Sequence, residues 1–163
     1  MFQLLFIVIL AMPLVLIAVG QLGLLRGQQP TDLGVKNGKL KGLSSTPNCI
    51  SSQASLYPNH TQTTYAAIEP LPLKASGNVA ASLAALAKVL RAVPGITVIE
   101  ERPDYLYAQA QTRLLQFTDD VEFWFNPTKQ SIDMRSASRL GQKDFAANRN
   151  RIEAVRAAYL ASP

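Results

Sequence analysis

Acidic and basic side chains gather in the last third of the chain, and their types allow several kinds of chemistry. Two carboxylates placed close together can act as general acid and general base. Guanidinium groups donate paired hydrogen bonds to phosphate or carboxylate, and so suit an anionic ligand or a lipid head group. The candidate polar cluster consists of Asp119, Asp120, Glu122, Arg135, Arg139, Asn148, Arg149 and Arg151.

Three interpretations of this cluster are open, and we favour the one without catalysis. The favoured one is a salt-bridge network that fixes the register of the strands. The second is a site in which the arginines bind a small anion or a head group. The third is a hydrolytic pair of Asp119 or Asp120 with Glu122. It is the least favoured, because neighbouring arginines lower the pKa of a carboxyl group whereas a general acid needs a raised pKa.

The sequence contains few of the residues that nucleophilic catalysis, metal binding or redox chemistry requires. His60 is the only histidine and Cys49 the only cysteine, which excludes an intrachain disulfide and a cluster of His and Cys ligands. Ser136 and Ser138 have no base near them in the sequence. We therefore predict no catalytic residue, no cofactor and no metal site.

Periodic patterns predict the elements that must position the cluster. A first strand is expected within 63–73, followed by a helix from Asn78 to Ala92 with Ser76 or Asn78 as its N-cap. Apolar and polar residues then alternate in four further strands, at 96–101, 105–112, 121–125 and 132–135. A second helix runs from about Asp144, a suitable N-cap, to Leu160, and its inner face carries Phe145, Asn148, Ile152, Val155 and Tyr159. The fold class is therefore α+β, a two-layer arrangement of about five antiparallel strands with both helices on one face.

The turn predicted at 126–129 sets the register of the last two strands. In the predicted pairing Asp120 faces Arg135, while Glu122 lies opposite Asp133. Two carboxylates directly opposite each other repel, so this register requires a cation between them. Apolar side chains of both strands then point to the core and charged ones to the other face.

The first 25 residues are far more apolar than the rest of the chain. They contain 20 apolar residues and no charged side chain, and as a helix they extend over about 36 Å, enough to cross a hydrocarbon core of about 30 Å. A cleaved signal peptide is disfavoured because no Lys or Arg precedes Arg26. We predict a transmembrane anchor over 1–26, an extended, partly packed connector over 27–62 and an α+β domain over 63–163.

The distribution of the net charge of +5 along the chain does not resemble that of a nucleic-acid-binding protein. Much of the basic excess follows the apolar segment, at Arg26, Lys36, Lys39 and Lys41, which indicates a basic patch near anionic head groups rather than a groove-reading surface. Basic residues that follow a membrane span favour the cytoplasmic side, so this positive-inside bias places the domain of a single-pass membrane protein there. An extracytoplasmic or lumenal domain is the alternative.

Six segments together resemble domain-of-unknown-function family 1499 over residues 33–160. They are 33–35 (LGV), 46–54 (TPNCISSQA), 105–106 (YL), 117–123 (FTDDVEF), 135–141 (RSASRLG), and Asp144 with 148–153 (NRNRIE). The resemblance implies a small bacterial or plastid protein, often with an N-terminal membrane or export segment, and no established activity, substrate or cofactor.

This chain departs from the family pattern where redox or metal chemistry would be expected. The family commonly has a second cysteine six residues before Cys49, where this chain has Leu43, and a histidine where it has Tyr107. The connector motif, Asn48, Cys49, Ser51 and Ser52, is then interpreted as architectural. Short polar side chains satisfy backbone groups where the connector folds back, and Cys49 is a small buried apolar residue.

The expected function is that of a non-catalytic, membrane-anchored domain. It binds a partner protein or assists a membrane complex, with the membrane contacted through 1–26 and no nucleic acid bound. The main alternative is a domain that binds a small anionic ligand or a lipid head group through the arginines. A hydrolase with an acidic pair is the third.

Overall fold

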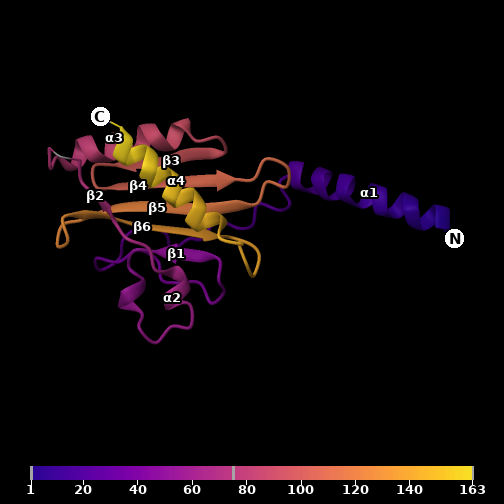
Figure 1. Cartoon of the computed structure of the whole chain (residues 1–163), viewed down its shortest axis with the longest axis horizontal. Helices are drawn as coiled ribbons and strands as arrows, with labels where there is room; N and C mark the ends of the chain where they lie inside the picture. Colours follow the sequence, from indigo (N-terminus) through magenta and orange to yellow (C-terminus); the bar gives the residue numbers. More distant parts are fainter. Residues whose placement is uncertain (1, 75, 163) are drawn as a thin grey trace.

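Four antiparallel strands and two long helices form the centre of the structure (Figure 1). The computed structural model describes residues 2–74 and 76–162, and for residues 2–10 only the backbone. The elements in chain order are α1 (Phe2–Gln21), β1 (Cys49–Ser51), the 3-10 helix η1 (Ala54–Leu56), α2 (Thr63–Ala66), β2 (Leu71–Pro72), α3 (Val79–Ala92), β3 (Ile96–Arg102), β4 (Tyr105–Gln111), β5 (Thr118–Asn126), β6 (Ser131–Ser138) and α4 (Ala147–Ala161).

The described strands form one six-stranded antiparallel sheet with the order β1-β6-β5-β4-β3, in which β2 also pairs with β6. Helices α3 and α4 cover one face (Figure 1). The apolar stripe of α3 and the inner face of α4 are buried there against alternate residues of β4, β5 and β6, including Leu106, Phe123 and Met134. Asn78 caps α3 by accepting a hydrogen bond from the Ala81 N–H. The α+β fold with both helices on one face is confirmed.

Residues 33–57 cover the opposite face of the sheet. A small cluster of Leu40, Tyr105, Tyr107 and Trp124 is buried between them and the strands. The segment also contributes β1, whose Ile50 reaches the core on the helix side. Much of the stretch predicted as connector is therefore integrated in the sheet and its packing.

Two secondary-structure predictions are wrong. Residues 63–66 form α2, and within the predicted first strand only Leu71–Pro72 pairs with β6. Pro70 and Pro72 have no N–H to donate, which limits the ladder at this edge. Phe145 does not lie on the inner face of the last helix. Its φ is 50° and its side chain is 89% exposed, since the helix begins only at Ala147, with Ala146 and not Asp144 at the N-cap position.

The predicted register of β5 and β6 is also wrong. Glu122 pairs with Arg135, and Trp124 with Asp133. The turn includes Gln130, whose φ is 50°, so the pairing moves by two residues from the prediction. A shift of two keeps every side chain on its predicted face and changes only its cross-strand partner. The expected clash of Glu122 with Asp133 is thereby replaced by an ion pair.

Helix α1 projects from one end of the domain (Figure 1). At its end, the Gln21 amide donates to the carbonyls of Arg113 and Leu114 in the β4–β5 loop. Within the described part of the chain, no helix has both the length and the apolar character needed to span a bilayer, so the predicted transmembrane helix over 1–26 is not supported. Residue 1 and the side chains of 2–10, on which that prediction also depends, lie outside the described residues.

Candidate functional site

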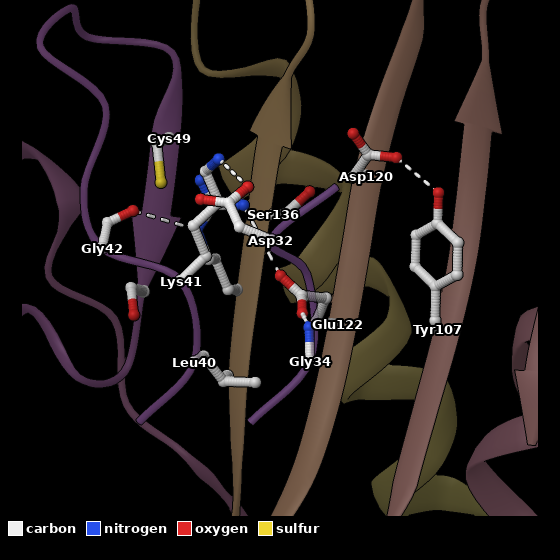
Figure 2. Close-up of polar contacts among 12 residues, drawn as sticks. Asp32, Gly34, Leu40, Lys41, Gly42, Cys49, Tyr107, Asp120, Glu122 and Ser136 are labelled. Carbon is white, nitrogen blue, oxygen red and sulfur yellow. Dashed lines mark hydrogen bonds and ion pairs between the residues drawn. The ribbon is translucent and has the colours of Figure 1, made fainter. Parts of the chain in front are cut away.

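Glu122 and Arg135 form a buried ion pair under the connector. Strands β5 and β6 place them directly opposite each other, and the distance from Glu122 Oε2 to Arg135 Nη1 is 3.6 Å. The other oxygen, Oε1, accepts hydrogen bonds from the Gly34 N–H at 2.7 Å and from the Tyr105 hydroxyl at 2.9 Å. Arg135 Nε donates to the Gly42 carbonyl at 3.2 Å. Figure 2 shows Glu122 pointing from the sheet to the connector backbone at Gly34.

The environment of Glu122 makes its ionised form costly. Burial raises the pKa of this carboxyl group, and the Gly34 N–H and Arg135 only partly offset the effect, so the expectation that neighbouring arginines lower the carboxyl pKa is wrong for Glu122. Burial and the adjacent Glu122 also raise the pKa of Tyr105. Among the described residues, Glu122 Oε2 has no hydrogen-bond partner. The carboxylate is thus held mainly through one oxygen and the field of Arg135.

A second pair on the same face joins Asp120 to Arg139. Arg139 donates to both carboxylate oxygens, from Nη2 to Oδ1 at 2.7 Å and from Nε to Oδ2 at 3.0 Å. The Tyr107 hydroxyl donates to Oδ1 at 2.6 Å (Figure 2). The hydrogen bond to Asp120 raises the pKa of Arg139, and burial with the bond to Asp120 raises the pKa of Tyr107 to about 12. This bidentate geometry is the strong form of an arginine–carboxylate interaction.

Asp133 is a third buried acid on this face, and it was not included in the predicted cluster. Its carboxylate accepts hydrogen bonds from Ser52 Oγ at 2.7 Å, Gln53 Nε2 at 2.8 Å and Asn126 Nδ2 at 2.7 Å. The two-residue alternation with Arg135 already placed Asp133 on this face, although the candidate cluster did not include it, and its partner Gln53 lies in the TPNCISSQA segment. Ser52 of the connector motif therefore binds a side chain of β6, whereas only backbone contacts were expected.

Three further residues of the predicted cluster, Asp119, Asn148 and Arg151, lie on the helix side. Arg151 Nη2 donates to Asp119 Oδ2 at 2.7 Å. Asn148 is fully buried and donates to the Asn48 carbonyl at 3.2 Å and to Ser138 Oγ at 3.1 Å, while it accepts from Ser136. These bonds join β1, β6 and the first turn of α4.

Arg149 belongs to neither group. It donates from Nη2 to the carbonyls of Tyr65 at 2.6 Å and Ala67 at 3.0 Å, and it lines a groove of about 730 Å³ beside α4. The four arginines are thus distributed over three places and do not converge on one anion. A separate cavity of about 260 Å³ lies over the connector, lined by residues that include Lys36, Lys39 and Lys41. Neither the groove beside α4 nor the cavity over the connector is lined by Glu122, Arg135 or Arg139.

The connector motif lies along β1 and its flanks. Asn48 donates to the Gly141 carbonyl at 2.7 Å, and Ser51 Oγ accepts from the Gln53 N–H at 3.1 Å. Cys49 is a buried free thiol. These contacts position the polypeptide, as the interpretation of the motif as architectural requires.

The geometry of the acids is poorly suited to acid–base catalysis. Asp119 and Glu122 point to opposite faces of β5, since side chains alternate along a strand, and each contacts an arginine. Asp120 shares a face with Glu122 but is bound by two guanidinium nitrogens of Arg139, Nε and Nη2. Among the residues that the structure describes, no three side chains of His, Cys, Asp or Glu lie together so as to hold a metal ion.

The comparisons with known proteins give one match. No curated protein and no solved structure is significantly similar to this chain. Residues 39–159, which include both buried ion pairs and the connector motif, match the family described as Protein of unknown function (DUF1499). Since the match covers well over half of the sequence, the chain belongs to this family.

Proposed function

We propose that this protein is a non-catalytic binding domain, attached to a membrane by its N-terminal segment, whose partner protein binds in the groove beside α4. We call this the α4 groove; its lining is Ser51, Ser52, Ala54, Ser55, Ala67, Ile68, Glu69, Pro70, Lys129, Arg149, Glu153 and Arg156. The observation that carries the proposal is that the predicted acidic side chains are not free to bind a ligand, whereas the α4 groove is accessible. The predicted acids are occupied by internal partners, whereas about 730 Å³ of the α4 groove is open.

The walls of the α4 groove are tied together by arginines, which supports a preformed binding surface. Arg156 donates to the carbonyls of Glu69 and Pro70, and Arg149 to those of Tyr65 and Ala67. Helix α4 therefore holds the 65–70 segment in place. A preformed surface loses little conformational entropy on binding, so more of the contact energy contributes to affinity.

Attachment to a membrane, as part of or beside a membrane complex, is supported by the sequence of residues 1–25. It has 20 apolar residues and no charge, and Arg26 follows directly. The positive-inside bias favours a cytoplasmic domain. Carbonate extraction of membranes tests the attachment, since release of the full-length protein into the supernatant would contradict it.

A small anion in the same α4 groove is the second candidate. Lys129, Arg149 and Arg156 line the groove against the two carboxylates of Glu69 and Glu153, so cationic side chains, which suit phosphate or carboxylate, are in excess. Titration calorimetry with inorganic phosphate tests this possibility. Heat of binding that disappears in Arg149→Gln would favour the ligand over a protein partner.

The partner interaction is tested by filling the α4 groove. Ser55→Trp places a large side chain at an exposed lining position, and Ala84→Trp on the exposed side of α3 is the matched control. We expect affinity purification in mild detergent to recover a partner with the wild type and the control, but not with Ser55→Trp, at equal thermal stability. Recovery of the same partner with both variants would exclude the α4 groove.

A further inference from the structure

The end of the domain from which α1 projects carries exposed apolar side chains on three separate segments. They are 22–27 after α1, the β4–β5 loop (112–117) and the β6–α4 loop (139–146), which lie at the same end of the sheet (Figure 1). We call this set the α1-end surface; its exposed apolar residues are Leu22, Leu24, Leu114, Phe117, Leu140 and Phe145. Such residues scattered singly need no explanation, but a group at one end indicates a contact surface.

Direct contacts hold the three segments together. Gln21 Nε2 donates to the Leu114 carbonyl at 2.8 Å. Gly27 lies so close to the β6–α4 loop that a Cβ added there would be 2.9 Å from Leu140 Cγ. Its φ is 68°, which glycine adopts without strain. These contacts join residues 22–27 to the β4–β5 loop and to Leu140 at the base of α1, and Phe145 follows in the same loop as Leu140.

Phe145 is the most exposed member, at 89%. Its backbone φ is 50° and that of Ala146 is 65°, a left-handed conformation that is unfavourable for a bulky residue. Asp144 holds this turn by accepting hydrogen bonds from the N–H groups of Ala146 at 3.1 Å and Asn148 at 3.0 Å. A strained turn that directs an aromatic ring into solvent indicates that the ring is covered when the protein functions.

The charge of the three segments identifies what covers them. They contain four basic residues and one acidic residue, Asp144, whose carboxylate is occupied by backbone N–H groups and the Tyr65 hydroxyl. Arg139 is paired with Asp120, which leaves the charges of Arg26, Arg113 and Lys143. Apolar and cationic side chains together match the interface of an anionic bilayer.

We propose that the α1-end surface lies in the head-group region of an anionic bilayer. Phe145 and Leu114 then reach the boundary of the acyl chains, and Arg26, Arg113 and Lys143 lie at the level of the phosphates. This inference rests on the proposed membrane attachment and adds to it the end of the domain that faces the lipid and the charge of that lipid.

Fluorescent labels at single cysteines test the orientation in the full-length chain. In a Cys49→Ala background, Phe145→Cys, Leu114→Cys and Gln130→Cys are each labelled with an environment-sensitive dye. Gln130 is exposed in the β5–β6 turn at the other end of the sheet and is the control. With vesicles of phosphatidylcholine and phosphatidylglycerol, we expect a blue shift and loss of iodide quenching at Phe145→Cys and Leu114→Cys, and no change at Gln130→Cys.

Other results of the labelling experiment would contradict the proposed orientation, the membrane attachment or the role of lipid charge. Labels at positions 145 and 114 that stay as accessible as the control, while the chain sediments with vesicles, would overturn the orientation and leave the membrane attachment intact. Failure to sediment with any vesicle would remove the attachment and this inference together. A blue shift without vesicles would show that a second copy covers the surface, and an equal shift with phosphatidylcholine alone would exclude the role of lipid charge.

Discussion

The two faces of the sheet are buried by different means. On the helix face, Phe123 and Met134 pack against apolar side chains of α3 and α4. On the connector face, Glu122 and Arg135 are buried, and the backbone groups of Gly34 and Gly42 bind them. The N–H and C=O groups inside a helix already bond to each other, so a helix covers apolar residues, whereas an irregular segment has free backbone groups for buried charges. The connector and the ion pairs are therefore one structural unit.

The largest expected effect lies on the helix face. Phe123→Ala removes a fully buried ring from the centre of the core and should lower the free energy of unfolding by about 3–5 kcal/mol. Urea denaturation measures the change. The control Phe145→Ala, at an exposed ring, should stay within about 0.5 kcal/mol; an equal loss in both variants would contradict the assignment of the core.

A somewhat smaller loss is expected on the connector face. Arg135→Met leaves Glu122 buried without a counterion and should cost about 3 kcal/mol. In Arg135→Met/Glu122→Gln both charges are gone, and the side-chain carbonyl of the new glutamine can still accept from the Gly34 N–H. The double variant should therefore lose clearly less than the sum of the single variants, as urea denaturation of all three would show. Additive losses would mean that the two side chains do not interact.

The pH dependence sharpens this second prediction. Since burial raises the pKa of Glu122 above its ordinary value of 4.5, the folded state binds this proton before the unfolded state as the pH falls. The contribution of Glu122 to the free energy of unfolding therefore rises as the pH falls towards about 4.5 and is constant below it. Without Arg135 the pKa rises further, so the deficit of Arg135→Met should be smaller at about pH 5 than at about pH 7.

The smallest effect is expected in the turn that precedes α4. Asp144 is partly buried, which raises its pKa, but hydrogen bonds from Tyr65 and Asn148 outweigh burial and lower it. Its stabilising effect is thus present above about pH 3.8 and lost as the pH falls through the lowered pKa. Asp144→Ala removes the acceptor of the Ala146 and Asn148 N–H groups. It should cost about 1–2 kcal/mol near pH 7, the range measured for a lost capping side chain, and less in acid.

Thermal unfolding across this pH range checks the role of Asp144. The control is Glu100→Ala, which removes a surface ion pair with Arg102 and should cost less than about 1 kcal/mol. A deficit of Asp144→Ala that does not shrink in acid would show that the carboxylate charge is not what stabilises the turn.

Local patterns were sufficient for the elements that pack against the core. The stripe on α3 and the alternation in β3 to β6 are set by which residues must leave water, and this depends on the period of each element. Local patterns were insufficient to predict β1 and the register of β5 with β6. A strand of three residues has too little periodicity to detect, and the position of Gln130 in the turn at a φ of 50° moved the pairing by two.

The candidate site was predicted as a set of residues but not as an arrangement. The alternation along β5 predicted that Asp120 and Glu122 share a face, and the structure confirms it through their contacts. The alternation could not show that Arg149 lies in the α4 groove, apart from the other cluster residues, because the direction of α4 across the sheet depends on core packing. Nor could it identify Gln53 as a ligand of Asp133, 80 residues away.

The sequence by itself determined the α+β class, the two helices that cover the sheet, the strands β3 to β6, the faces of their side chains and the family. Only the tertiary structure decided which charges meet, since a shift of two residues leaves every face unchanged but exchanges every partner. It also decided that residues 33–57 bury the charged face. That outcome depends on individual backbone groups such as the Gly34 N–H, and every residue except proline has such a group, so no residue type reveals it.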